Sequence, residues 1–486
     1  MTTKDPDADE LQEFGYQQQL RRSMGSFSSF AVAFSLISIF TGVFANFGHG
    51  LRQVGGALVW SWLLVLAGQM LVALVLAELS TRFPLSGYGY QWTSRLVNPH
   101  FGFFVGWLLV LQFLTGFPGV CATLATQAGN WLGGSWAGPA GVRALTLGVI
   151  AITALVHLFG IRLSSRVNNV GVWTELLGVT ALSVLLIGIA LARDASPAML
   201  VNSSNATTAQ PAGLGAWALS LLVGAWCLTG FEAAADLAEE TRQPRRVVPR
   251  AILLSLLSSG VAGLLLLGGV MLAITDVTAA QQAENPLLHT LQATFGSMGM
   301  TSVLAVVGVS VLACGLASMA ATSRLLFAMA RDRMLPGSRW LAFVAQGHRT
   351  PRNAILFIWA VSSGVVLGLP TLDIITQISA VAGYLGYAGI IFAALRCRPA
   401  TVTDGFRLGT SRRWIGGAAL VWVLGLVAAL TIPPTPLAGI ATQHLPALST
   451  AIAIAAGLVV YFGVIRRRLV RGEAGPPTTP SEVRHD

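Results

Sequence analysis

Long apolar stretches alternate with short polar ones along most of this chain. A helix that crosses a bilayer needs roughly 20 mostly apolar residues, and twelve such stretches can be marked. Apolar and polar residues do not alternate with period two, which disfavours a β-barrel, so helices are expected to satisfy the backbone in lipid. The expected spans are 27–48, 57–80, 101–130, 143–162, 168–192, 214–238, 250–274, 300–329, 353–370, 374–395, 414–432 and 446–465.

The composition places these helices in a membrane. Of the 486 residues, 54% are hydrophobic and only 10% are charged, too few charged side chains for a soluble surface. The expected fold is therefore an all-α integral membrane protein. Polar tails, expected to be disordered, occupy 1–26 and 471–486 around one transmembrane domain, 27–470. No loop exceeds about 25 residues, well below the size of a soluble domain.

The net charge of +10 raises the question of a nucleic-acid partner. The distribution of the basic residues along the chain indicates instead the orientation of a membrane protein. With twelve spans, only Arg52, Arg143 and Arg193 lie on the side opposite the termini. The positive-inside rule then predicts that both termini are in the cytoplasm. The plasma membrane is the expected location of the protein. No nucleic-acid partner is expected. The first apolar run lacks a convincing cleavage site and is expected to remain as helix 1.

Residues for enzymatic or metal chemistry do not gather in the sequence. Cys121, Cys227, Cys314 and Cys397 are scattered singly, without metal or redox spacing. Neither a P-loop nor an H-E-x-x-H motif is present, so ATP hydrolysis and zinc chemistry are not predicted. We therefore expect a protein that is not an enzyme and that holds no cofactor or metal.

Two apolar spans carry small and hydroxyl residues near their middles. The first span contains Ser38, Thr41 and Gly42, and the sixth contains Thr229 and Gly230. Such residues also occur in tightly packed membrane helices, which is the plainer interpretation of either span alone. Their separation by five spans is what an inverted repeat with two discontinuous helices requires.

This interpretation predicts repeats over about 27–192 and 214–395, followed by two extra helices at about 414–432 and 446–465. A broken helix exposes N–H groups that attract a carboxylate and C=O groups that attract an ammonium or a metal cation. The pair of breaks therefore suits a zwitterionic or cationic solute.

Four motifs resemble those of a known family. They are "IFTGVF" (Ile39 to Phe44), "AELSTRFPLSGYGYQW" (Ala77 to Trp92), "GFEAAADLAEETRQPRRVVPRAI" (Gly230 to Ile252) and "SRLLFAMARDRMLP" (Ser323 to Pro336). Together they resemble the amino acid, polyamine and organocation permeases, including the amino acid/choline transporter branch. The resemblance implies five helices repeated in inverted order plus two more, and secondary active transport of a small-molecule amino acid or related amine.

The sequence departs from the family pattern at two positions of interest. Phe40 stands where the family has its first helix 1 glycine, and Glu175 stands where many proton-linked members have a lysine. Glu175 lies about 12 Å along its helix from Val167, and an ionisable group at that depth is functional or paired by default. We rank Glu175 as a coupling candidate ahead of the alternative, a neutral carboxyl that hydrogen-bonds between helices.

The four carboxylates after the second break are expected to differ in role. Glu232 either caps the half-helix after Gly230 or attracts the amine of the solute, and Asp236 follows one turn later on the same face. Glu239 and Glu240 are expected to be structural. Their predicted partners are the neighbouring arginines, Arg242, Arg245, Arg246 and Arg250.

The predicted solute site lies between helices 1, 3, 6 and 8. Main-chain N–H groups of Thr41 to Val43 are expected to bind a carboxylate, and carbonyls near Ser35 to Ile37 and Trp226 to Leu228 an amine. For Gln112, Trp226 and Phe231, interhelix packing is the competing interpretation. The predicted substrate-binding residues are Ser38, Thr41, Gly42, Val43, Gln112, Trp226, Thr229, Gly230, Phe231 and Glu232.

These features predict a transporter that works by alternating access around a site at the bilayer midplane. Import coupled to protons is the expectation that comes from the family resemblance, with sodium as the other possible coupling ion. A membrane sensor that binds the solute without moving it would keep the same pocket, so this alternative stays open.

Overall fold

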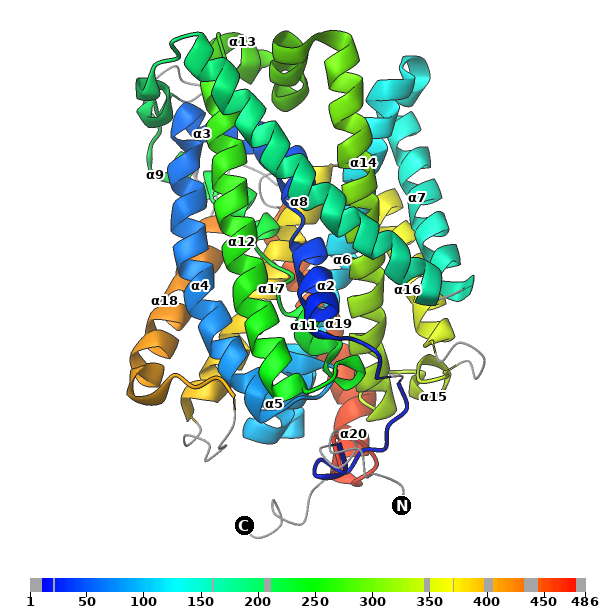
Figure 1. Ribbon diagram of the computed structural model, residues 1–486. Coiled ribbons are helices and arrows are strands. Elements are labelled where there is room, and N and C mark those ends of the chain that lie inside the picture. The colour runs from blue at the N-terminus through cyan, green and yellow to red at the C-terminus, as the bar shows by residue number, and fades with distance from the viewer. Residues whose placement is uncertain are drawn as a thin grey trace, which may run out of the picture.

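The fold is a bundle of helices, and the first and last parts of the described chain, near residues 11 and 477, lie at the same end of the bundle (Figure 1). The computed structural model describes residues 11–20, 22–159, 161–204, 211–344, 350–369, 371–396, 405–431 and 445–477. Within these ranges the chain forms helices and two isolated bridges but no β-strand, in agreement with an all-α fold. Cys397 lies outside the described residues.

The first part of the chain contains eleven helical elements that matter for the site. They are α2 (Ser26–Ile37), α3 (Ile39–Val54), η1 (Gly55–Ala57), α4 (Leu58–Arg82), α5 (Tyr88–Leu96), α6 (Pro99–Leu132), α7 (Pro139–Phe159), α8 (Ile161–Ala192), α9 (Leu214–Ser220), α10 (Leu222–Cys227) and α11 (Ala233–Asp236).

The second part continues in the same manner to the other end of the chain. Its elements are η4 (Ala238–Glu240), α12 (Pro244–Ala273), α13 (Val277–Gln282), α14 (Pro286–Arg331), α15 (Ser338–Leu341), α16 (Arg352–Gly368), α17 (Leu372–Arg396), α18 (Arg412–Thr431), α19 (Leu445–Val460) and α20 (Arg466–Val470).

Nine helical segments among the described residues are long and apolar enough to cross a bilayer, and two shorter apolar helices, Leu214–Cys227 and Arg352–Gly368, accompany them. One of the nine, Ser26–Arg82, has 57 residues, which as a single straight helix would extend roughly 85 Å. The chain reverses within it, because α3 and α4 are separated by the short turn η1. The chain is therefore a multi-pass membrane protein.

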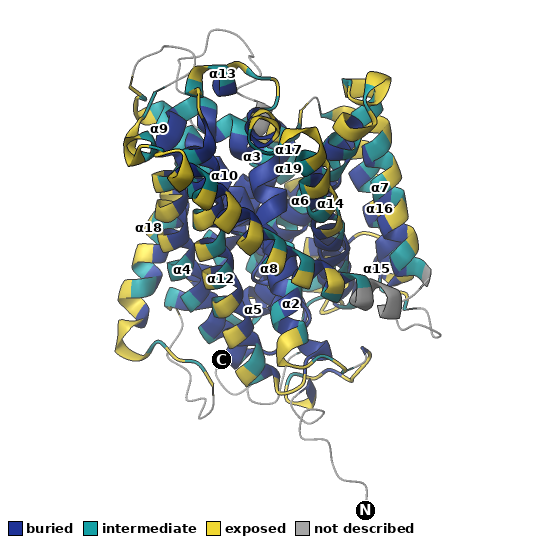
Figure 2. Cartoon of the chain, turned by 45° about the horizontal axis from the view of Figure 1, so that its top comes forward, coloured by how far each residue is buried: buried dark blue, intermediate teal, exposed yellow. Residues whose placement is uncertain are grey.

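The outward faces of the bundle are apolar, as contact with lipid requires. Figure 2 shows exposed residues along α8, α12 and α18, and buried residues in the interior. Large apolar side chains stand exposed on these faces, among them Trp173, Leu177, Leu254 and Val421.

Several helices extend beyond the limits that the apolar windows predicted. α8 begins at Ile161 instead of 168, and α14 begins at Pro286 instead of 300. The added turns contain polar residues, which a hydropathy window leaves out. In α14 the side chain of Asn285 accepts a hydrogen bond from the Leu288 amide and caps the helix, and Gly296, with φ of 68°, kinks it.

Two helices are interrupted in the interior of the bundle. α2 and α3 meet at Ser38, whose φ of 32° and ψ of 97° leave the helical region, and whose side chain accepts a hydrogen bond from the Thr41 amide. α10 ends at Cys227 and α11 begins at Ala233, with Gly230 between them at φ of 101°. A glycine tolerates that φ without the steric cost that a side chain would bring.

The segment before α2 lies against the end of the bundle that carries the termini, so residues 11–20 and 22–25 are not the disordered tail that their polarity predicted. Leu11, Tyr16 and Leu20 are buried. The Tyr16 hydroxyl donates to Asp332 at 2.9 Å, and the guanidinium of Arg331 lies 3.9 Å from the Tyr16 ring centroid. These apolar and aromatic contacts outweigh the polar composition of the segment.

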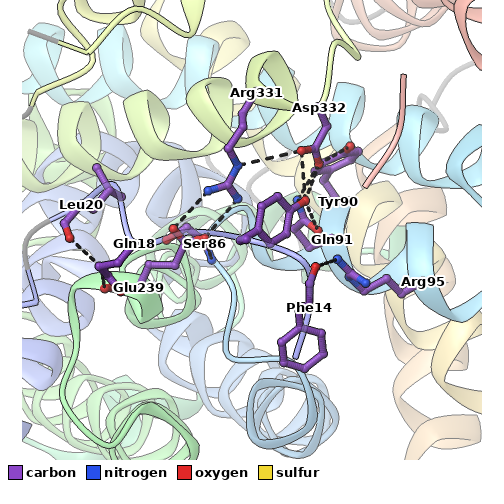
Figure 3. A network of polar contacts seen from close by, with 11 residues as sticks. Phe14, Gln18, Leu20, Ser86, Tyr90, Gln91, Arg95, Glu239, Arg331 and Asp332 are labelled. Carbon is purple, nitrogen blue, oxygen red and sulfur yellow. Dashed lines mark hydrogen bonds and ion pairs between the residues drawn. The ribbon is translucent and has the colours of Figure 1, made fainter. Parts of the chain in front are cut away.

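Asp332 is the centre of this contact. Its carboxylate also accepts hydrogen bonds from the Tyr90 hydroxyl and the Gln91 amide, each at 2.8 Å (Figure 3). Burial raises the pKa of Asp332, while the neighbouring Arg331 charge and the hydrogen bonds oppose that shift. The segment thus joins α5 to the end of α14 through one buried carboxyl group.

Candidate solute-binding site

A small cavity lies where the two helix interruptions meet. Its volume is about 40 Å³, room for only a few water molecules. α2 and α3 approach it from one side and α10 from another, while α6, α14 and α17 complete the wall. The lining residues are Leu36, Ile37, Thr41, Gln112, Phe113, Gly116, Val120, Trp226, Cys227, Thr229, Gly230, Cys314, Ser318 and Ser379.

The structure divides the predicted site residues into two groups. Thr41, Gln112, Trp226, Thr229 and Gly230 line the cavity. The other five are buried or nearly enclosed beside the interruptions without lining it. They are Ser38, Gly42, Val43, Phe231 and Glu232.

Gly42 brings the two interrupted helices together. A Cβ atom at this position would lie 2.2 Å from Sγ and 2.3 Å from Cβ of Cys227 on α10. The Gly42 amide donates to the Ser38 carbonyl at 3.0 Å, so in this conformation it is engaged within its own chain segment. The structure therefore accounts for Gly42 by close helix packing.

The end of α2 presents carbonyl groups that have only weak partners. The Ile37 carbonyl lies 3.7 Å from Sγ of Cys227, and the Leu36 carbonyl lies 3.6 Å from Sγ of Cys314. A thiol is a weak donor, and both Leu36 and Ile37 line the cavity. In contrast, the Leu228 carbonyl accepts a hydrogen bond of 2.8 Å from the Gln69 amide. The Leu36 and Ile37 carbonyls of α2 are therefore weakly partnered acceptors in the wall of the cavity.

Glu175 of α8 lies at the beginning of α3. It is only 1% exposed, and its Oε1 accepts a hydrogen bond of 3.3 Å from the Phe40 amide. The first N–H groups of a helix have no partner within the helix, and the helix dipole favours a carboxylate there. Glu175 thus occupies the end of α3 where the sequence predicted a solute carboxylate, and it does not line the cavity.

Glu232 lies directly behind the cavity wall. Its two oxygens accept hydrogen bonds from the Gln112 side chain at 3.2 Å and from the Gly230 amide at 2.9 Å. One carboxylate therefore connects α6 to the interruption before α11 and orients two of the lining residues. Asp236, one turn later, is also fully buried.

Glu239 and Glu240 do not pair with the arginines that follow them in sequence, as was predicted. Glu239 pairs with Arg331 at 3.1 Å, and Glu240 pairs with Arg324 at 2.9 Å. Both arginines belong to α14. The prediction was wrong about the partners because η4 turns these carboxylates into the bundle, while Arg245 pairs with Glu13 at 2.8 Å.

Several lining residues carried no signal in the sequence. They come from uninterrupted parts of α6, α14 and α17, where nothing distinguishes one apolar or small residue from the next. The available signal for a residue near the site was a serine within an apolar helix. Ser379 is such a residue, and its hydroxyl donates to the Gln112 carbonyl at 2.8 Å. The unpredicted lining residues are Phe113, Gly116, Val120, Cys314, Ser318 and Ser379.

A multi-pass helical membrane protein with two interrupted helices around a central cavity is thus defined, and comparison with known proteins names its family. The family described as "Amino acid permease" matches residues 24–458. The chain therefore belongs to the amino acid permease family, and the resemblance noted in its motifs is confirmed.

Individual relatives extend along most of the chain. Amino-acid permease BAT1 of Arabidopsis thaliana is 27% identical over 456 residues, which cover 87% of this chain and 88% of the relative. Branched-chain amino acid permease BcaP of Bacillus subtilis is 28% identical, covering 71% of this chain and 75% of the relative. Thiamine transporter thi9 of Schizosaccharomyces pombe is 26% identical, covering 87% of this chain and 79% of the relative. These names indicate a transporter rather than an enzyme.

Proposed function

We propose that the protein is a secondary active transporter that moves a small neutral amino acid across the plasma membrane by alternating access. The observation that carries this proposal is the cavity at the meeting point of the two helix interruptions. Polar main chain is tolerated at this depth only where it is enclosed by protein or lines a cavity, and there it is able to bind a zwitterion.

The two ends of the solute are assigned to different groups. Its ammonium group binds the weakly partnered carbonyls of Leu36 and Ile37. Its carboxylate binds at the start of α3, at the hydroxyl of Thr41, whose present partner is the Ser38 hydroxyl at 2.7 Å. The proposed role of Gln112 and Glu232 is to hold the opposite wall in place.

The lining of the cavity favours a neutral side chain on the solute. Among the described residues, none of those that line it is charged. An isolated charge in such surroundings would be costly, so glutamate, lysine and putrescine are disfavoured. In this conformation the cavity of about 40 Å³ has room for only a few water molecules. It must widen to bind a solute, and a short side chain, as in alanine or serine, requires the least widening.

The finer architecture is also part of the proposal. The chain reversal inside Ser26–Arg82, together with the shorter apolar helices, is compatible with twelve spans. The proposed arrangement has inverted repeats over about 27–192 and 214–395, and both termini in the cytoplasm. The interruptions at Ser38 and Gly230 support it, since each lies in the first helix of its repeat.

The proposed coupling ion is a proton, and Glu175 is the candidate that carries it. Its carboxyl group is buried at the beginning of α3, next to the interruption. A change in its protonation alters the charge at the end of that helix. Such a change would affect the position of α3 against α2, which is the kind of movement that alternating access requires.

Counterflow in proteoliposomes tests the proposal without any ion gradient. Vesicles loaded with unlabelled L-alanine are expected to take up labelled L-alanine, and L-serine is expected to compete better than L-glutamate, L-lysine, choline or putrescine. Thr41→Val removes a lining hydroxyl and is expected to raise the KM about tenfold, the effect of one lost hydrogen bond to a charged group. The matched control, Thr180→Val, changes an exposed threonine on α8.

The alternative of a sensor predicts a different result. A sensor would bind L-alanine in the purified state and show no counterflow. Counterflow that is equally sensitive to charged and neutral competitors would instead contradict the assignment of a neutral solute.

A further inference from the structure

A second and larger cavity lies nearer to the end of the bundle that carries the termini. Its volume is about 130 Å³, enough for a solute the size of a small amino acid. Ser23 and Met24 of the segment before α2 form part of its wall, together with residues of α2, α7, α8 and α14. We call it the inner cavity.

The inner cavity follows the central one along the same two helices. On α2, Leu36 lines the central cavity, and Val32, one turn earlier, lines the inner one. On α14, Cys314 and Ser318 line the central cavity, while Leu316, Ala317, Ala320 and Arg324 line the inner one. The two cavities therefore overlap in depth on α14, and the inner one extends further toward the end of that helix. The inner cavity therefore lies beside the central one and extends further toward the end of the bundle that carries the termini.

The inner cavity contains an ion pair with one free atom on each partner. Arg324 donates through Nε to Oε1 of Glu240 at 2.9 Å and through Nη1 to the Ser323 hydroxyl at 3.1 Å. Within the described chain, Nη2 of Arg324 and Oε2 of Glu240 have no hydrogen-bond partner. Both side chains are more than nine-tenths buried, and both line the cavity.

Asn168 of α8 adds a further acceptor to the same wall. It is 6% exposed and lines the inner cavity, and its Oδ1 atom is enclosed without a hydrogen-bond partner among the described residues. A buried polar atom that lacks a partner is costly and points to a ligand or water that is bound there. The free carboxylate and amide oxygens match an ammonium group, and the free guanidinium nitrogen matches a carboxylate.

We propose that the inner cavity is a second binding site for the zwitterion of an amino acid, with its carboxylate on Arg324 and its ammonium group on Glu240 and Asn168. The proposal rests on the proposed transport of amino acids and extends it. The inner site receives the solute after it leaves the central cavity and holds it before release on the side of the termini.

The experiment is equilibrium binding of labelled L-alanine to the purified full chain in detergent, with counterflow measured on the same preparations. The wild type is expected to bind a second L-alanine molecule per chain. Ala320→Leu places a larger side chain in the inner cavity and is expected to abolish the second binding event but not the first. The matched control, Ala305→Leu, makes the same change at an exposed position of α14 and is expected to retain both.

A second variant keeps the test decisive if Ala320→Leu does not fold. Asn168→Ala removes one acceptor and leaves the ion pair intact, and it is expected to weaken the second binding event about tenfold without changing the first.

The outcomes separate the two proposals. If the wild type shows counterflow but binds a single L-alanine molecule per chain, the inner site is overturned and the transporter proposal stands. The same conclusion follows if Ala320→Leu still binds a second L-alanine molecule. Absence of all binding overturns the inner site, and absence of counterflow with every solute overturns the transporter as well.

Discussion

The contact between Gly42 and Cys227 predicts a specific pattern of damage and rescue. In Gly42→Ala the new methyl group would lie 2.2 Å from Sγ and 2.3 Å from Cβ of Cys227. Ordinary van der Waals contacts begin near 3.4 Å, so α3 and α10 would have to separate by more than an ångström. Overpacking of this kind costs about 1–3 kcal/mol.

A second substitution at Cys227 distinguishes the atoms responsible. Cys227→Ala removes Sγ but keeps the Cβ atom at 2.3 Å, so it is not expected to rescue Gly42→Ala. Cys227→Gly removes both atoms and leaves the Cα atom at 3.0 Å, a contact that small shifts relieve. The double variant Gly42→Ala with Cys227→Gly is therefore expected to recover most of the lost stability. It should remain less stable than the wild type by roughly 1 kcal/mol, the cost of a glycine in a helix.

The assay compares thermal unfolding in detergent with the counterflow rate for each single and double variant. Gly42→Ala and its combination with Cys227→Ala are expected to unfold at lower temperature and to exchange L-alanine more slowly. The reasoning would be refuted if Gly42→Ala were as stable as the wild type, or if alanine and glycine at position 227 rescued it equally.

Two further predictions concern groups outside the cavity. Glu175→Gln keeps an oxygen that is able to accept a hydrogen bond from the Phe40 amide, so counterflow is expected to persist. The dependence of uptake on a proton gradient is expected to be lost. If this dependence is unchanged, Glu175 does not carry the coupling proton. Tyr16→Phe deletes the hydroxyl that donates to Asp332 but keeps the ring beneath Arg331, and is expected to lower the stability by about 1–2 kcal/mol and to expose the segment before α2 to protease. Unaltered cleavage of Tyr16→Phe would show that this hydrogen bond does not hold the segment.

The sequence predicted what depends on composition and on local backbone chemistry. Apolar runs of sufficient length indicated membrane helices, because lipid contact imposes the same requirement on every residue of a span. The interruptions were foreseen among Ser38, Thr41 and Gly42 in the first span and at Thr229 with Gly230 in the sixth, since small and hydroxyl residues tolerate a non-helical backbone. The structure places them at Ser38 and Gly230.

What the sequence did not predict depends on side chains that meet from distant elements. Ser379 and Cys314 line the cavity, yet neither belongs to a motif. Glu240 pairs with Arg324, 84 positions away, although arginines stand much closer to it in sequence. Such pairs are decided by the direction in which a helix presents each residue, and a single sequence carries little information about this direction.

Net uptake of labelled L-alanine into proteoliposomes under an imposed inward proton gradient tests the central claim most directly. Protein-free liposomes and a sodium gradient serve as controls. The account predicts that L-alanine accumulates above its external concentration and that the accumulation collapses when a protonophore is added. Uptake that only equilibrates under every gradient, or binding without any flux, would contradict secondary active transport.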